Sequence, residues 1–242
     1  MNKLFGLPPV GEVKINPLTL SFPPELEKVY LEEQVERSMG HVRLSSYLGL
    51  FFYGVFGFLD SVLMPEIKEE LWFIRYAIFW PYAILMLLFS YTSLFKKVWQ
   101  PAISSVVLVA GLGIIAMIII APQEVGYLYY AGLILVFFYG YTFFKLRFIW
   151  ASLTGLTIVA AYEIAAIWLR PTPFAVLVNN NFFFLTGNVF GMFTCYAMEF
   201  YSRQDFIQVR LLAAERAVAR LVKFTQASSS TNTATREKRV TY

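Results

Sequence analysis

Residues 101–120 read PAISSVVLVAGLGIIAMIII, a stretch that contains no charged side chain. An α-helix rises about 1.5 Å per residue, so a stretch of this length spans the ~30 Å hydrocarbon core of a bilayer. None of the apolar stretches alternates with the period of a strand, and an open sheet would leave backbone polar groups unpaired in lipid. The sequence therefore predicts an all-α, polytopic membrane protein with a six-transmembrane-helix bundle and cytoplasmic helices at both ends. The other five stretches occupy residues 44–63, 72–95, 127–144, 148–169 and 181–201.

The composition agrees with this fold class. Hydrophobic residues make up 58% of the chain and charged residues only 15%, whereas soluble domains carry about 25% charged residues. The net charge of +4 comes from Lys and Arg residues that gather before the first stretch, between the second and third, between the fourth and fifth, and after the sixth. Under the positive-inside rule, this placement puts both termini in the cytoplasm. The expected partner is the lipid bilayer and no nucleic acid.

The chain divides into four segments. Residues 1–43 end in a juxtamembrane helix that begins near Pro24, with acidic residues in its first turn, where the helix dipole favours them. Residues 44–201 form the transmembrane domain, and residues 202–226 form a connector helix. Residues 227–242 are rich in Ser, Thr and charge, which predicts a disordered tail.

The connector helix carries apolar residues at alternating steps of four and three, which is the seam of a left-handed coiled coil. If Leu211 and Val218 are a positions, Arg210 at g and Glu215 at e are placed for an ion pair between two parallel chains. The seam is short, and an amphipathic helix on the inner leaflet, with its Arg residues toward lipid headgroups, remains the alternative. The seam consists of Ile207, Leu211, Ala214, Val218 and Leu221.

The sixth stretch has a face of small and polar residues. Gly187, Gly191 and Cys195 form a small-xxx-small run, and Asn188 and Glu199 lie on the same side. Such runs let helix backbones approach closely, either within one chain or across a dimer, and both interpretations stay open. Cys195 is the single cysteine, so an intrachain disulfide is excluded and a buried, unreactive thiol is expected.

Several charged and amide side chains fall near the periplasmic ends of the predicted spans. Such groups are costly in hydrocarbon and need a partner or a purpose. One interpretation is a structural ion pair of Arg75 with Asp60 or Glu163, capped by amides. The other is a small-ligand or ion pocket open to the periplasmic side. The cluster consists of Asp60, Arg75, Glu163, Asn179, Asn180 and Asn181.

Motifs for catalysis and cofactor binding are missing from the sequence. Gly111, Gly113 and Ala116 match a dinucleotide-binding pattern, but they lie inside a span with no preceding strand. His41 is the only histidine, so multi-histidine metal or haem ligation within one chain is excluded. We expect no catalytic residue, metal or cofactor in this chain, and we do not expect it to be an enzyme.

Motifs from four parts of the chain point to a family. They are FPPELE (22–27) with HVR (41–43), LGL (48–50) with FGFLD (56–60), WFIRY (72–76), and NFFFL (181–185) with Asn188, GMF (191–193), EFY (199–201) and RQDF (203–206). Together they resemble the six-span amino-terminal region of bacterial membrane-bound class III adenylate/guanylate cyclases, over roughly residues 17–212.

The resemblance implies a multi-pass protein of the bacterial inner (cytoplasmic) membrane that passes a signal through a cytoplasmic helix to a cyclase domain. The coiled-coil seam of the connector helix adds a homodimer to this expectation. The residues after Phe224 lack the metal-binding aspartates and nucleotide-reading residues of such a domain. The cyclase output domain is therefore expected elsewhere, and a stand-alone relative, a truncated or split gene and an isolated domain all fit the pattern.

Two classes of function fit these observations. The first is a membrane-embedded sensory input, anchor and dimerisation module without a catalytic domain. The second is a small transporter or a lipid- or ion-handling integral membrane protein, for which broken spans and inverted repeats are expected. No internal repeat is evident, and Pro81 is the only proline well inside a span, so the sequence favours the first class. The residues do not identify the ligand.

Overall fold

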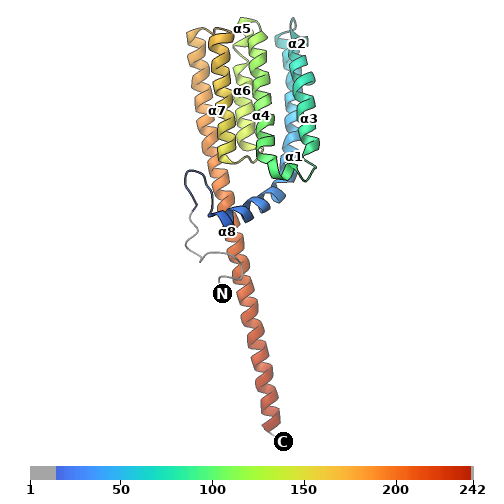
Figure 1. Cartoon of the computed structure of the whole chain (residues 1–242), viewed down its shortest axis with the longest axis vertical. Coiled ribbons are helices and arrows are strands. Elements are labelled where there is room, and N and C mark those ends of the chain that lie inside the picture. Colours follow the sequence, from blue (N-terminus) through green and yellow to red (C-terminus); the bar gives the residue numbers. More distant parts are fainter. Residues whose placement is uncertain (1–14, 241–242) are drawn as a thin grey trace.

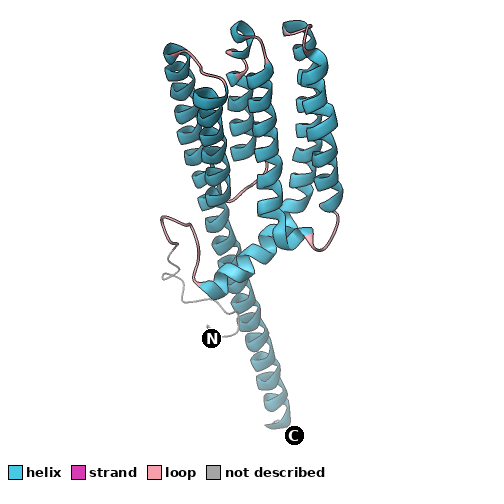
Figure 2. Ribbon diagram, turned by 45° about the horizontal axis from the view of Figure 1, so that its top comes forward, coloured by secondary structure: helices cyan, strands magenta, loops and turns pink. Residues whose placement is uncertain are grey.

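The computed structural model describes residues 15–240, and every regular element in that part of the chain is a helix (Figures 1 and 2). Two of the helices contain π-helical turns, labelled η. The elements are α1 (Pro24–Leu63), α2 (Lys68–Trp72), η2 (Phe73–Phe79), α3 (Trp80–Phe89), α4 (Phe95–Ile120), α5 (Gln123–Gly126), α6 (Tyr130–Thr142), α7 (Phe148–Ile164), η3 (Ala165–Leu169) and α8 (Phe174–Val240).

The bundle consists of helices that stand side by side along one direction (Figure 1). α4 lies centrally and packs against both α6 and α7, while α8 packs against α6 and α7. α1 packs against α2, η2 and α3. We call the end from which α8 leaves the bundle the proximal end, and the opposite end, with α2 and α5, the distal end.

α1 joins two segments that the sequence treats separately. The predicted juxtamembrane helix and the first predicted span are one continuous helix of 40 residues, which begins with Pro24 in its first turn and Glu25 and Glu27 beside it. Its first half lies obliquely across the proximal end and reaches α8, and its second half rises into the bundle (Figures 1 and 2).

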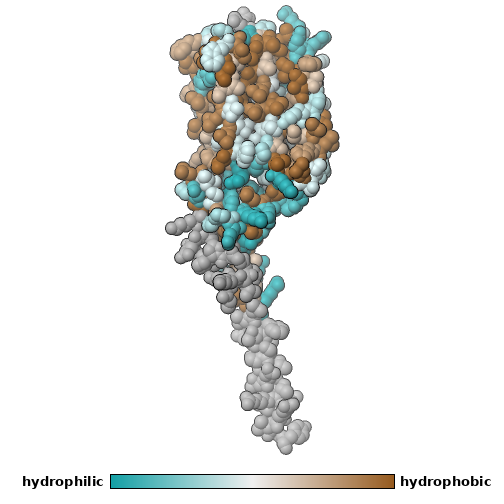
Figure 3. Space-filling view, in the orientation of Figure 1, coloured by the Kyte–Doolittle hydropathy of each residue, from teal (hydrophilic) through white to brown (hydrophobic). Residues whose placement is uncertain are grey.

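Four helical segments are long and apolar enough to cross a membrane: Pro24–Leu63, Lys68–Phe89, Phe95–Ile120 and Phe148–Leu169. Large apolar side chains are exposed along the bundle, including Phe58 at 74% and Phe193 at 73%. Figure 3 shows a largely hydrophobic surface over the bundle, above a hydrophilic proximal end. Since a soluble protein does not expose apolar surface on this scale, these features indicate a membrane protein.

The structure confirms an all-helical membrane fold, but only four of the predicted six spans are long and apolar enough to count as candidates. α6 is apolar but has only 13 residues. The fourth stretch, 127–144, is shorter as a helix because its first residues form a turn before Tyr130. α8 is not among the four, and its part within the bundle carries Asn179, Asn180, Asn181 and Asn188.

α8 is longer than predicted. It continues to Val240, through most of the segment for which the sequence predicts a disordered tail, and the last two residues lie outside the described part. Adding a residue to an existing helix needs no new nucleation, which is the costly step, so a helix already formed in the bundle can extend through a segment of weak propensity.

Candidate functional site

The most buried charges in the distal half of the bundle form one ion pair. Arg75 Nε donates to Asp60 Oδ2 at 2.8 Å, and Arg75 Nη2 donates to Asp60 Oδ1 at 3.0 Å. The side chains are 3% and 1% exposed. Tyr129 donates its hydroxyl to Asp60 Oδ1 at 2.6 Å, and Arg75 Nη1 donates to the Tyr53 carbonyl at 2.8 Å. The pair is therefore electrically neutral and held by hydrogen bonds that involve α1, η2 and Tyr129, the residue that precedes α6.

Local sequence explains how Arg75 reaches Asp60. Arg75 lies in η2, where the Trp80 N–H bonds to the Arg75 carbonyl five residues back. Pro81 follows directly and has no N–H to donate, and π turns commonly rearrange the backbone bonding near such a residue. α1 offers Gly57 opposite, where a Cβ would lie 2.0 Å from the Tyr76 hydroxyl oxygen. Glycine thus permits the close approach of α1 and η2 that joins the pair.

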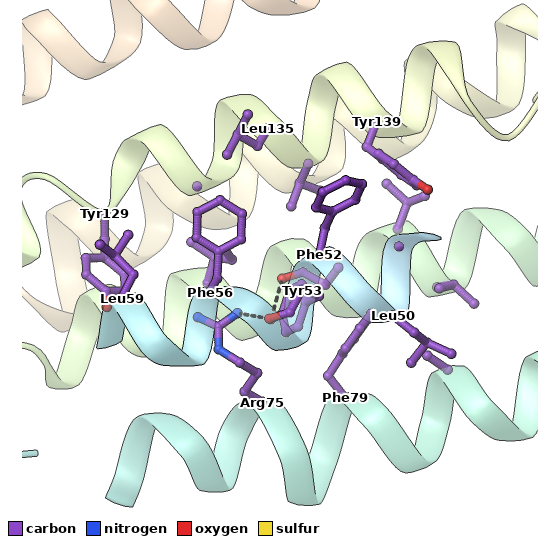
Figure 4. A pocket seen from close by; sticks show the side chains of 18 of the residues that line it. Leu50, Phe52, Tyr53, Phe56, Leu59, Arg75, Phe79, Tyr129, Leu135 and Tyr139 are labelled. Carbon is purple, nitrogen blue, oxygen red and sulfur yellow. Dashed lines mark hydrogen bonds between the residues drawn. The ribbon is translucent and has the colours of Figure 1, made fainter. Parts of the chain in front are cut away.

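An apolar cavity of about 210 Å³ begins at this ion pair and runs between α1, α3, α4 and α6. Asp60, Arg75 and Tyr129 line its distal end, and Ser46 and Tyr139 line its proximal end. Figure 4 shows Tyr129 and Tyr139 at opposite ends of the cavity, with aromatic side chains of α1 reaching toward α6 between them. The walls between the two ends are hydrophobic and include Phe52, Phe56, Phe79, Ile103, Val107 and Val136.

The other predicted cluster residues do not join this ion pair, which corrects the expectation of one polar cluster. Glu163 lies on α7, and its Oε1 is buried with no hydrogen-bond partner among the described residues. Tyr162 takes the inward position on this turn, and the next residue of a helix lies about 100° away around the axis.

The three asparagines also lie elsewhere, at the start of α8. Asn180 is buried and donates to the Tyr162 hydroxyl at 2.7 Å. Asn179 donates to the Asn180 side chain at 3.2 Å, and Asn181 bonds back to the Leu177 carbonyl at 3.1 Å. These amides therefore join α8 to α7 and satisfy local backbone. Among the residues whose side chains the structure describes, no group of three His, Cys, Asp or Glu side chains lies close enough to hold a metal ion.

The inward face of α8 carries Asn188 and Cys195. Tyr141 of α6 donates to Asn188 Oδ1 at 2.9 Å, and both side chains are buried. A Cβ on Gly191 would lie 2.2 Å from the Tyr141 ring, whereas a Cβ on Gly187 would meet nothing within 4 Å. Gly191 therefore serves packing within the chain, and Gly187 does not. Cys195 is 2% exposed, and its thiol donates to the Leu146 carbonyl at 3.3 Å.

A second buried cluster closes the proximal end, and we call its members Glu27, Arg147, Glu199 and Arg203 the proximal clasp. Arg203 is fully buried and donates to Glu27 at 2.6 and 3.0 Å and to Glu199 at 2.8 and 3.0 Å. Arg147 lies 3.3 Å from Glu27 and 3.5 Å from Glu199. Two acidic and two basic groups thus join the first half of α1, the start of α7 and α8.

Aromatic packing around Arg203 and a lowered pKa of Glu27 are consistent with the ion pairs of the clasp. The Arg203 guanidinium lies 4.3 Å from the centre of the Tyr30 ring, within a small core made by Phe22, Leu26, Tyr30 and Phe206. Burial alone would raise the pKa of Glu27, but the hydrogen bonds from Arg203 and the Phe22 N–H and the charges of Arg203 and Arg147 outweigh it and lower that pKa. Glu27 is therefore held in its charged form.

The far end of the first half of α1 is tied to the turn between α3 and α4. Arg43 donates to the Ser90 carbonyl at 2.8 Å and lies 4.0 Å from the centre of the Tyr91 ring. Lys96 donates to Glu36 at 2.6 Å on the surface. The first half of α1 thus connects the α3–α4 turn to α8. Sequence reasoning assigns the Lys and Arg residues to topology and Glu199 to the polar face of the sixth stretch, but it misses that Glu199 and Arg203 are spaced for an i,i+4 pair.

Comparison with known proteins gives one family. No curated protein is similar enough in sequence to count as a match. The family model MASE8 matches residues 58–213, well over half of the chain. The matched region contains the ion pair, most of the cavity, and α8 to a point just beyond Arg203 and Arg210. The chain therefore belongs to MASE8, a family of membrane-associated sensory domains.

Proposed function

We propose that the chain is the sensory input and anchoring module of a receptor whose output is a cyclase-type domain, and that α8 carries the signal. The observation that supports this most is the continuity of α8 from the interior of the bundle to Val240. Asn180, Asn188 and Arg203 are all buried on it, so one helix touches the distal end, the middle and the proximal clasp. A change in bundle packing would therefore shift or rotate the helix that leaves it.

The proposal includes six spans with both termini in the cytoplasm. α6 and the bundle part of α8 stand beside the four longer spans (Figure 1), and Lys and Arg favour the proximal side. Reporter fusions along the chain test this arrangement, since activity should alternate between outside and inside. An outside signal at the carboxyl end would refute it. The fusion points are Pro65, Lys97, Gln123, Arg147, Pro171 and Tyr242.

The proposal also includes a parallel homodimer formed by the part of α8 beyond the clasp. Val218, a residue of the seam, is 39% exposed, so apolar surface is available there. Arg210, which the seam places for a pair between chains, instead bonds to Glu33 of α1 in the same chain. We therefore place the dimer contact after Arg210, around Ala214 and Val218.

A chimera tests signal transmission directly. A class III cyclase catalytic domain joined after Phe224 should be active in membranes. Inserting one alanine after Ala213 rotates everything downstream by about 100° and should change the activity severalfold. Inserting seven residues at the same place returns the helix to within about 20° of its phase and should restore the activity. Equal activity in all three chimeras would make α8 a passive tether and refute the signalling role.

A further inference from the structure

The space between α1 and α6 is bridged at two points and hollow between them. Tyr129 donates to Asp60 at 2.6 Å at the distal end, and Tyr139 donates to the Ser45 carbonyl at 2.6 Å at the proximal end. Ten residues separate these tyrosines, which corresponds to about 15 Å along a helix. The 210 Å³ cavity fills the interval between the two bridges, so its shape is a slot that runs along the helices.

The slot faces the lipid side of the bundle. Phe52, Phe56 and Leu135 line it and are 51%, 37% and 48% exposed, so their outer surfaces lie where acyl chains surround the protein. Its inner wall is formed by Ile103 and Val107 of α4, which are only 2% and 6% exposed. A molecule in the slot would therefore enter sideways from the bilayer and touch side chains that bulk lipid does not reach.

The lining selects an apolar guest. A cavity of about 150 Å³ lined by Leu, Ile and Phe stays dry and binds benzene, and this slot is larger and similarly lined. Side chains around an unfilled space lose dispersion contacts, which a guest of matching shape restores. In hydrocarbon surroundings, the abundant molecule that is long, narrow and apolar is an acyl chain.

The distal end sets the polarity of the guest. Arg75 and Asp60 neutralise each other, so the end of the slot attracts neither a cation nor an anion. Four of the five Arg75 N–H donors bond to Asp60, Tyr53 and Met117. The fifth has no partner among the described residues. This donor suits a neutral acceptor, such as an ester carbonyl, a hydroxyl or a protonated acid.

We propose that the slot between α1 and α6 binds one acyl chain from the membrane, with its neutral polar end at Arg75. That this chain is the sensed ligand rests on the proposed function, but its binding does not. Both walls of the slot lead to α8, because α6 packs on α8 and the first half of α1 holds α8 through the proximal clasp. An occupant that alters the separation of α1 and α6 would thus act on α8 from two sides.

Photolabelling of the full chain in nanodiscs tests binding without any output domain. Two probes are used separately: palmitic acid with a diazirine in its chain, and phosphatidylcholine with the same group in one acyl chain. Mass spectrometry then locates the labelled residues. We expect label on Ile103 or Val107 that unlabelled palmitic acid or phosphatidylcholine competes away. The probe that gives this label identifies the source as a free fatty acid or a phospholipid chain.

Variants that fill the slot provide the control. Val136→Phe and Ala131→Phe, both in the lining, should reduce the interior label about tenfold, the change expected for the loss of ~1.4 kcal/mol. Val189→Phe makes a change of the same kind as Val136→Phe at an exposed position outside the slot and should leave the label unchanged. Melting temperatures near that of the parent show that the variants fold.

The outcomes separate the two proposals. Label confined to outward-facing residues, or interior label unaffected by both filling variants, would overturn the acyl-chain site. Interior label together with a cyclase chimera that responds neither to the filling variants nor to the helix insertion would leave the site standing and refute the sensory role.

Discussion

Replacing Asp60 should lower the stability of the protein more than other single changes, because Arg75 would remain buried without its partner. Asp60→Asn keeps the shape of the side chain but removes its charge. We expect a loss of roughly 3–5 kcal/mol in stability, the usual cost of breaking a buried ion pair. Replacing Arg75 by Met as well should recover part of the loss. The measurement is thermal unfolding of the purified protein in detergent.

Glu163 is the matched control. Like Asp60, it lies in the predicted periplasmic half of the membrane, and the sequence offers both residues as partners of Arg75. In the structure, however, the buried Oε1 of Glu163 has no hydrogen-bond partner among the described residues. Glu163→Gln should therefore leave the melting temperature unchanged or raise it. Equal destabilisation by the two variants would show that the pairing with Asp60 is wrong.

Gly187 and Gly191, the two glycines of the small-xxx-small run, should also differ in how much stability their replacement by alanine costs. Gly191→Ala places a Cβ 2.2 Å from the Tyr141 ring and should force α6 away from α8, with a loss of about 1–3 kcal/mol. Gly187→Ala meets nothing within 4 Å and should gain up to about 1 kcal/mol of helix propensity. If Gly187→Ala instead weakens self-association, the run also serves a dimer contact.

Among the elements, the first half of α1 is the one whose position depends most on a few side chains. Glu27→Gln removes the charge that Arg203 and Arg147 share and should cost about 1.5–3 kcal/mol. Hydrogen exchange of residues 24–38 should accelerate, while exchange in α4 and α7 stays slow. Glu25→Gln, an exposed change in the same helical turn, loses only the interaction with the helix dipole and should have a much smaller effect. Unchanged exchange in Glu27→Gln would refute the clasp.

The clasp should also depend on pH. The pKa of Glu27 is lowered from its ordinary value of 4.5, so its contribution to stability is fully present above 4.5 and is lost as the pH falls through the lowered value. Spin labels at Lys28 and Gln208, in a Cys195→Ser background, should move apart below that pH. Glu27→Gln should give the wide distance at every pH, and a distance that never changes in the parent would count against this role of Glu27.

Sequence alone predicts those features that depend on local pattern. The apolar stretches predict the helices, and the cost of charge in hydrocarbon predicts that Asp60 and Arg75 need partners. The choice of Asp60 over Glu163 depends on which helix lies beside η2, and the hydrogen bond of Glu27 to Arg203 joins residues 176 apart. The slot depends on two tyrosine bridges between α1 and α6. Such long-range contacts leave no periodic signal in one sequence.

At the scale of the whole molecule, the proximal clasp connects α1 directly to α8. α1 contacts the slot with its second half and α8 with its first half, and α8 runs from the bundle core to Val240. The exposed face of α8 begins where the clasp ends, since Phe206 is buried and Val209 and Leu212 are 44% and 51% exposed. In the proposed function, the signal therefore leaves the bundle through the region after Arg210.

Disulfide crosslinking tests whether that region pairs with a second copy. Cysteine at the seam position Ala214, in the Cys195→Ser background, should crosslink readily, because a close parallel pair brings the two copies within disulfide reach. Cysteine at Arg216, two residues on and exposed, points away from the seam and should crosslink far less. Equal crosslinking at both positions would indicate random collision. Efficient crosslinking at Ala214 alone, with a severalfold change of cyclase output in the insertion chimera, would show that the pairing carries the signal.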